Sequence, residues 1–161
     1  MDARGFDRFS ARVVPDYAAA KAIAGDWDFE GAAEKARNEL KRLLPGGLAT
    51  PGNHLFSVRT ADDQREVGQA WIAERRASGK SVAFLLDLFI HEGERRRGFG
   101  RSTMTALEDW ACRRRMEEMR LHVFDDNAGA AALYRTLGYR AIAGEMFKPL
   151  PTRREEKELR E

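Results

Sequence analysis

Arg95-Arg96-Arg97-Gly98-Phe99-Gly100 is the most informative stretch of this 161-residue sequence. It follows the apolar run 81–90, which predicts a buried strand, and it precedes residues 102–115, whose apolar positions recur with the period of a helix. A basic, glycine-containing turn between strand and helix suits phosphate, because the first N–H groups of a helix lack intrahelical partners and the helix dipole adds positive charge there. The stretch therefore predicts an anion-binding turn, with a plain helix start and a solvated basic face as the alternative.

The glycines and the arginines contribute to this turn in different ways. Gly98 and Gly100 have no Cβ, so their backbone can approach a ligand closely and adopt dihedral angles that other residues avoid. The arginines at positions 95–97 and 101 supply charge suited to phosphate oxygens. The spacing excludes a Walker loop, and the third glycine of a dinucleotide fingerprint is missing.

Composition narrows the class of ligand and the compartment. The chain is 43% apolar and 34% charged with a net charge of +2, so its clustered arginines fit a small anion better than a nucleic acid. Cys112 is the one cysteine, which excludes an internal disulfide and a thiolate metal cluster, and no metal is expected. No apolar run approaches the ~18 residues of a membrane span, and no signal-peptide core precedes the first helix, so we expect a cytoplasmic protein that does not bind membranes.

The periodicities predict a single domain over residues 1–150, followed by a charged tail, 151–161, that is either a frayed helix or disordered. Pro15 and Asp16 are expected to start the first helix, and Phe29 is expected on the buried face of the second. The predicted helices are 16–24, 28–44, 102–115 and 128–137, with a loop at 48–53; the predicted strands are 55–60, 66–74, 81–90, 121–124, 139–142 and 145–150, the last two joined at Ala143-Gly144. The strand–helix–strand crossover after residue 81 implies a parallel pair in a mixed sheet, with a ligand crevice where the two strands diverge.

Two motifs at this spacing resemble the Gcn5-related N-acetyltransferase (GNAT) superfamily, in particular its small bacterial members. The first is Arg95-x-x-Gly98-x-Gly100, and the second comprises Asn127, Ala130, Leu133, Tyr134, Gly138 and Tyr139. The resemblance implies an α/β (α+β) fold. In that fold a mixed central sheet of six to seven strands is flanked by about four helices, with a cleft between two splayed parallel strands.

The resemblance also implies an acetyl-CoA site in that cleft. The pyrophosphate would lie on the N–H groups of residues 96–101, the pantetheine arm would pair with the strand near residue 88 and with Asn127, and the Tyr134 hydroxyl would face the CoA sulfur. The implied cofactor-binding residues are Leu88, Phe89, Ile90, Arg95, Arg96, Arg97, Gly98, Phe99, Gly100, Arg101 and Asn127.

Elementary chemistry is consistent with direct transfer to a primary amine. A strand N–H near Leu88 is suited to stabilise the oxyanion of an attacked thioester. A phenol with a pKa of about 10 is protonated at neutral pH, so Tyr134 suits a proton donor, although it also has the spacing of a core tyrosine. Asp87, the one acid within its strand, is a candidate base or amine-binding group, and Glu92 lies just past the strand's end.

Several alternatives stay open at this point. The chain would be a non-catalytic acyl-CoA sensor if turnover were lost, or it would use another acyl group. His54, His91 and His122 are more typical of structural positions than of catalysis, and Asn127 is also an ordinary helix cap. The acceptor is a small-molecule or peptide amine, not a nucleic acid, and we expect a monomer or homodimer.

Overall fold

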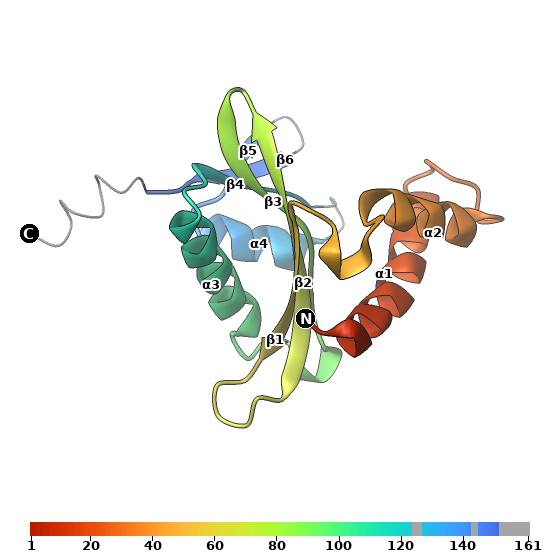
Figure 1. Cartoon of the computed structure of the whole chain (residues 1–161), viewed down its shortest axis with the longest axis horizontal. Helices are drawn as coiled ribbons and strands as arrows, with labels where there is room; N and C mark the ends of the chain where they lie inside the picture. Colours follow the sequence, from red (N-terminus) through yellow and green to blue (C-terminus); the bar gives the residue numbers. More distant parts are fainter. Residues whose placement is uncertain (124–126, 143–144, 152–161) are drawn as a thin grey trace, which may run out of the picture. The chain divides into compact units, whose positions relative to one another are not determined.

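The computed structural model describes residues 1–123, 127–142 and 145–151. In chain order, the elements are α1 Ala3–Ile23, α2 Ala32–Leu43, the 3-10 helix η1 Gly47–Ala49, β1 Asn53–Arg59, β2 Glu66–Ala77, β3 Lys80–Ile90, the 3-10 helix η2 Glu92–Glu94, α3 Phe99–Arg113, β4 Glu118–His122, α4 Ala128–Thr136, β5 Arg140–Ile142 and β6 Glu145–Pro149 (Figure 1). The chain divides into two compact units, Met1–Leu55 and Phe56–Glu161. Phe124, the turn at Ala143-Gly144 and residues 152–161 of the predicted tail lie outside the described residues.

The first unit begins with a longer helix than the sequence predicted. The carboxylate of Asp2 accepts a hydrogen bond from Gly5 N at 2.7 Å and caps α1 at its start, thirteen residues before the predicted helix. Pro15 lies inside α1, so the expected start at Asp16 is wrong. A prolyl nitrogen removes one helical hydrogen bond, yet the helix continues because Phe9 and Ala18, on either side of Pro15, are both buried.

The second helix starts later than predicted. Gly31 has a φ of +79° at the cap of α2, a left-handed conformation that reverses the chain just before the helix. Phe29 therefore lies outside the helix and is 75% exposed, not buried as its periodicity indicated. Small side chains form the contact with α1, since Ala32 and Ala36 are buried together with Ala18. The expected loop after α2 contains the short helix η1.

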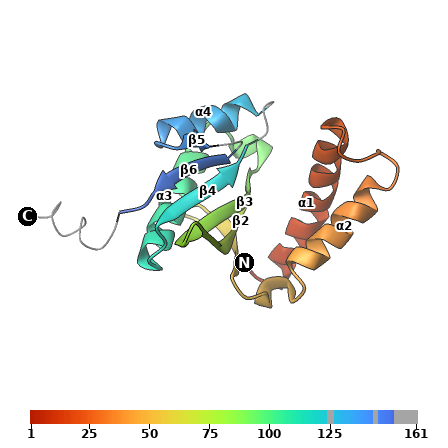
Figure 2. The same ribbon diagram turned by 90° about the horizontal axis from the view of Figure 1, so that it is seen from above.

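The second unit is built on a six-stranded sheet in the order β1-β2-β3-β4-β6-β5. Figure 2 labels β2 to β6 of this sheet. The pair β3–β4 is parallel, as the crossover predicted, while β2–β3, β4–β6 and β5–β6 are antiparallel. Helices α3 and α4 share one buried cluster with the sheet. Its largest members include Ile72, Leu85, Met104, Leu107, Met119, Leu121, Tyr134, Tyr139 and Met146. The predicted fold, including strand and helix numbers, is confirmed.

The parallel pair stops early, and this opens the sheet. Val82 to Leu85 of β3 face Glu118 to Leu121 of β4, and the register ends there although β3 continues to Ile90. On the other side of β3, Trp71 pairs with Asp87 while Ile72 pairs with Leu85. Leu86 is therefore the extra residue of a β-bulge, which bends β3 away from β4.

β4 begins at Glu118, three residues earlier than predicted. The prediction missed this start because the first residue of the strand is a buried acid. Glu118 is only 3% exposed, and its carboxylate pairs with Lys80 and with Arg120. The hydrogen bond from Lys80 is the main cause that holds the pKa of Glu118 below its ordinary value. Hydropathy does not indicate a strand at such a position, since the ion pairs exist only after folding.

Gly68 is required by the close approach of β2 to β3. A Cβ at this position would lie 2.2 Å from the carbonyl oxygen of Phe89, a backbone atom that cannot turn away. Gly68→Ala is expected to lower the unfolding free energy by about 1–3 kcal/mol, the usual cost of overpacking, in urea denaturation. Gly93→Ala is the matched control, because nothing lies within 4 Å of a Cβ there. Equal stability of the two variants would contradict this packing.

Candidate active site

The splayed end of the sheet holds a groove with a volume of about 680 Å³ between β3, the start of α3 and α4. Its lining residues are Leu88, Phe89, Ile90, Glu94, Arg95, Arg96, Gly98, Gly100, Arg101, Asn127, Gly129, Ala130, Ala132, Leu133 and Tyr134. Most residues that the sequence proposed for cofactor binding are thus brought to one cavity. Arg97, Phe99 and Asp87 are not among the lining residues.

The start of α3 leaves its first N–H groups available to a ligand. Gly98 caps the helix with a φ of +86°, and no side chain of the described chain caps it by hydrogen bonding. Arg96 is also left-handed, with a φ of +63°. The N–H groups of Phe99, Gly100 and Arg101 belong to the first turn, which has no intrahelical acceptors for them. Three backbone N–H groups are thus presented at the turn where the sequence predicted an anion site.

The arginines of the turn have more specific contacts than a general basic patch. Arg95 Nε donates a hydrogen bond to Ile90 O at 3.1 Å, and Arg101 Nη2 donates to Thr136 Oγ1 at 2.8 Å. These bonds attach the turn to β3 on one side and to α4 on the other. They indicate that two of the arginines hold the shape of the groove in addition to supplying charge.

Glu94 is a member of the groove that the sequence reasoning missed. Its carboxylate pairs with both Arg65 and Arg97, and the hydrogen bond from Arg65 is the main cause that lowers the pKa of Glu94. Only its place one residue before three arginines could have indicated such a role. The pairing fixes η2, and it keeps Arg97 on the outside of the groove.

The edge of β3 that faces the groove carries backbone groups turned away from β2. His91 N donates to Val67 O at 2.9 Å, so His91 faces β2, and by alternation the N–H groups of Leu88 and Ile90 face the opposite side. The contact of Ile90 O with Arg95 agrees with this orientation. Because the described register with β4 ends at Leu85, the Leu88 N–H lies on the splayed edge.

α4 forms the other wall and approaches α3 closely. Asn127 Oδ1 accepts a hydrogen bond from Ala130 N at 3.1 Å, so this side chain caps α4. A Cβ at Gly100 would lie 3.2 Å from Leu133 Cδ2, so a larger residue there would have to push this leucine aside by a few tenths of an ångström. The small residue thus lets the two helices meet behind the groove.

Tyr134 belongs both to the core and to the groove. It is 7% exposed, its ring centroid lies 5.8 Å from that of Tyr139, and it still lines the cavity. Burial first, and the nearby negative charge of Asp87 second, raise the pKa of Tyr134 to about 12. The two sequence interpretations of this residue, core tyrosine and groove tyrosine, are therefore compatible. Asp87 lies within electrostatic range of the phenol.

Two of the remaining candidates, His91 and His122, contact phenylalanine rings. The His91 ring meets Phe89 edge-on at 5.5 Å, and the His122 ring lies 5.3 Å from that of Phe84. Within the described ranges, no group of three or more His, Cys, Asp or Glu side chains could hold a metal ion. Across those ranges, too, no helix is long and apolar enough to cross a membrane.

The sequence matches the Acetyltransferase (GNAT) family over residues 14–139. It is 30% identical over 150 residues to YycN of Bacillus subtilis, named an uncharacterized N-acetyltransferase, covering 93% of this chain and 96% of YycN. It is 27% identical over 150 residues to YdgE of the same organism, covering 93% and 95% of the two chains. The chain belongs to the GNAT family and is an acetyltransferase.

Solved structures agree with this assignment. The crystal structure of YycN superposes with a TM-score of 0.82 at 30% identity, covering 88% of this chain and 90% of the other. The spermidine N-acetyltransferase of Vibrio cholerae, solved in complex with CoA and spermine, superposes with a TM-score of 0.57 at 19% identity, covering 70% and 75%. The latter likeness is one of fold.

The charge of Asp87 is expected to tune the ionisation of Tyr134. Asp87→Asn should bring the pKa of Tyr134 down from about 12, while burial still keeps it above the ordinary value of about 10. The folded-state pKa is the raised one, so Tyr134 stabilises the fold fully below about pH 10 and loses this contribution as the pH rises toward 12. The ¹³Cζ resonance of Tyr134, assigned with Tyr134→Phe, reports the titration.

The control for this measurement is Asp109→Asn, which removes a carboxylate from the exposed side of α3. It should leave the Tyr134 titration where it was. An Asp87→Asn titration identical to that of the wild type would show that the carboxylate does not act on the phenol.

Proposed function

We propose that this protein transfers the acetyl group of acetyl-CoA to a primary amine by direct attack, without an acyl-enzyme. One observation carries the proposal. A single groove brings together the open first turn of α3, the splayed edge of β3 and the Tyr134 side chain. These would serve as a site for a polyphosphate, a site for an extended amide-bearing chain and a proton donor.

The residues of the groove fit CoA. The N–H groups of Phe99, Gly100 and Arg101 would hold the pyrophosphate at the positive end of α3. The edge of β3 at Leu88 to Ile90 would pair with the amides of the pantetheine arm, and Asn127 would face it from α4. Acetyl-CoA bound in this way supplies an acyl group already activated as a thioester.

The chain's own groups then serve the transfer. The Leu88 N–H would donate to the developing oxyanion. Tyr134, whose raised pKa of about 12 keeps it protonated at neutral pH, would give its proton to the departing sulfur. Asp87 would attract the ammonium of the acceptor and accept its first proton, so that the nitrogen can attack the thioester carbon. As the carbon–sulfur bond breaks, the second proton would leave the nitrogen to solvent, from which Tyr134 would be reprotonated.

The acceptor is proposed to be a small-molecule or peptide amine. Support for an amine comes from the relatives, which are named as N-acetyltransferases, and from the carboxylate of Asp87 close to Tyr134. Direct transfer is supported by the position of Cys112, the single cysteine, which is on α3 and not among the residues lining the groove. Residues 1–150 are proposed to act as one functional domain, since the family match crosses the division at residue 55.

Tyr134→Phe tests the proton donor. The variant keeps the ring in the core and should lower kcat by about a hundredfold or more, while the CoA dissociation constant changes less than about twofold. Thiol release from acetyl-CoA across polyamines, aminoglycosides and amino-terminal peptides measures turnover, and calorimetry measures binding. Tyr17→Phe, on α1, is the matched control. Unchanged kcat would exclude the donor role, and tight CoA binding without turnover of any amine would favour a non-catalytic acyl-CoA sensor.

Gly98→Val tests the phosphate turn. A β-branched residue cannot easily adopt the φ of +86°, so the first turn of α3 should deform and CoA should bind at least about tenfold more weakly. The matched control is Gly93→Val, because Gly93 has no positive φ and nothing lies within 4 Å of an added Cβ. CoA affinity equal in both variants would show that the turn does not hold the cofactor.

A further inference from the structure

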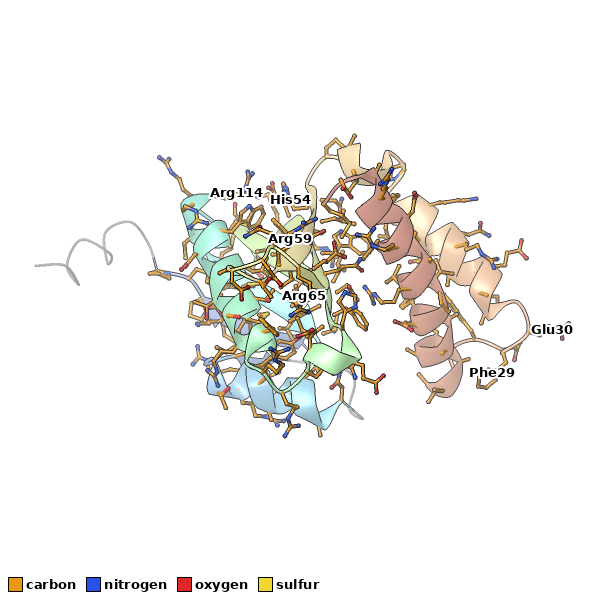
Figure 3. All side chains as sticks on the ribbon, turned by 90° about the horizontal axis from the view of Figure 1, so that it is seen from below. Phe29, Glu30, His54, Arg59, Arg65 and Arg114 are labelled. Carbon is orange, nitrogen blue, oxygen red and sulfur yellow. The ribbon has the colours of Figure 1, made fainter. Side chains whose placement is uncertain are left out.

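A second groove, with a volume of about 520 Å³, lies between β1 and α3 in the same unit. β1 is an edge strand, and residues 56–61 line the groove from that side. From α3 the lining includes Phe99, Thr103, Trp110 and Arg113. Figure 3 labels Arg59 on β1 and Arg114 at the end of α3, which mark this region. The acetyl-CoA groove shares none of these lining residues.

The floor of the second groove is a preformed aromatic surface. The rings of Phe56 and Trp110 meet edge-on with centroids 5.4 Å apart. The guanidinium carbon of Arg114 lies 4.7 Å from the Trp110 ring centroid and holds the indole from outside the groove. Ser102 and Ala106 add small side chains to the lining. An apolar body of drug-like size fits such a cavity.

The charged side chains that line the second groove are all positive. Arg59 and Arg113 line the groove, and none of its lining residues carries a carboxylate. Arg59 uses Nη1 to donate to Gln64 O at 3.2 Å, which fixes the side chain. A guanidinium presents paired donors that match a carboxylate. The groove therefore favours an anionic head group.

The lining of the second groove also includes Thr103, whose hydroxyl has no hydrogen-bond partner in the described structure. Thr103 is 8% exposed, and its Oγ1 is one of three buried side-chain polar atoms for which the described structure offers no hydrogen-bond partner. Buried hydroxyls are normally paired, so an unpaired one requires an explanation. Thr103 therefore adds an unpaired polar group to the wall that also carries the aromatic pair and the two arginines.

We propose that this second groove binds a small apolar carboxylate, with its hydrocarbon or aryl body on Phe56 and Trp110 and its carboxylate toward Arg59 and Arg113. An extended acidic peptide added to the edge of β1 fits less well. Thr60 N faces β2, because it donates to Arg65 O, so the odd-numbered residues of β1 face outward. Of these, Leu55 O already accepts from the Met1 ammonium at 3.2 Å, which leaves a short edge for pairing.

The test uses 4-phenylbutyrate and its neutral amide as probes, without CoA, so that its result does not depend on the proposed transfer reaction. The indole N–H signal of Trp110, assigned among the three tryptophans with Trp110→Phe, should shift and saturate with the acid. The amide should bind about tenfold more weakly. Arg59→Gln and Arg113→Gln should each weaken the acid about five- to tenfold and leave the amide unchanged.

Two further variants complete the experiment. Arg135→Gln, which removes an arginine from α4, should leave both probes unaffected. Ala106→Leu should fill the groove and prevent binding of both, with spectral dispersion confirming that the variant is folded. Equal affinity for acid and amide, no saturation up to about 20 mM acid, or signal changes centred on Leu88 and Tyr134 would overturn the proposal. Tighter binding of an extended acidic hexapeptide than of the acid would overturn it too.

Discussion

The early end of hydrogen bonding between β3 and β4 is the constraint on which the site depends. The two parallel strands pair for only four residues on each side, and the bulge at Leu86 turns the rest of β3 away. Backbone groups at Leu88 and Ile90 are then directed to a groove instead of a neighbouring strand. An uninterrupted sheet would have satisfied them internally. The opening is thus produced by the pairing of the backbone, and α3 and α4 only give it walls.

The basic turn gains its specificity from backbone conformation more than from its charge. Gly98 and Arg96 are left-handed, and this geometry presents the first N–H groups of α3. The arginines around them are largely engaged: Arg95 with Ile90 O, Arg97 with Glu94 and Arg101 with Thr136. Because these contacts fix the turn before any ligand arrives, less ordering remains for binding.

Burial gives Tyr134 its chemical character. The core cluster that removes its ring from water also disfavours the phenolate, and Asp87 acts in the same direction. A residue placed there for packing alone would have the same raised pKa, so its chemistry comes from its position at the boundary of core and groove. Tyr134 occupies this boundary because it belongs both to the core cluster and to the lining of the groove.

Most of the fold could be predicted from local sequence. The hydrophobic periodicity, the glycines between helices and strands and the two motifs indicated the sheet, the parallel crossover and the anion turn. Each of these features depends on residues close in the chain. Local signals failed at Pro15, Phe29 and Glu118, where burial, a left-handed glycine and ion pairs outweigh propensity. Only the tertiary structure revealed the bulge at Leu86, the place of Glu94 in the groove and the proximity of Asp87 to Tyr134. Strand register and electrostatic interaction through space connect residues whose spacing in the sequence gives no sign of the contact.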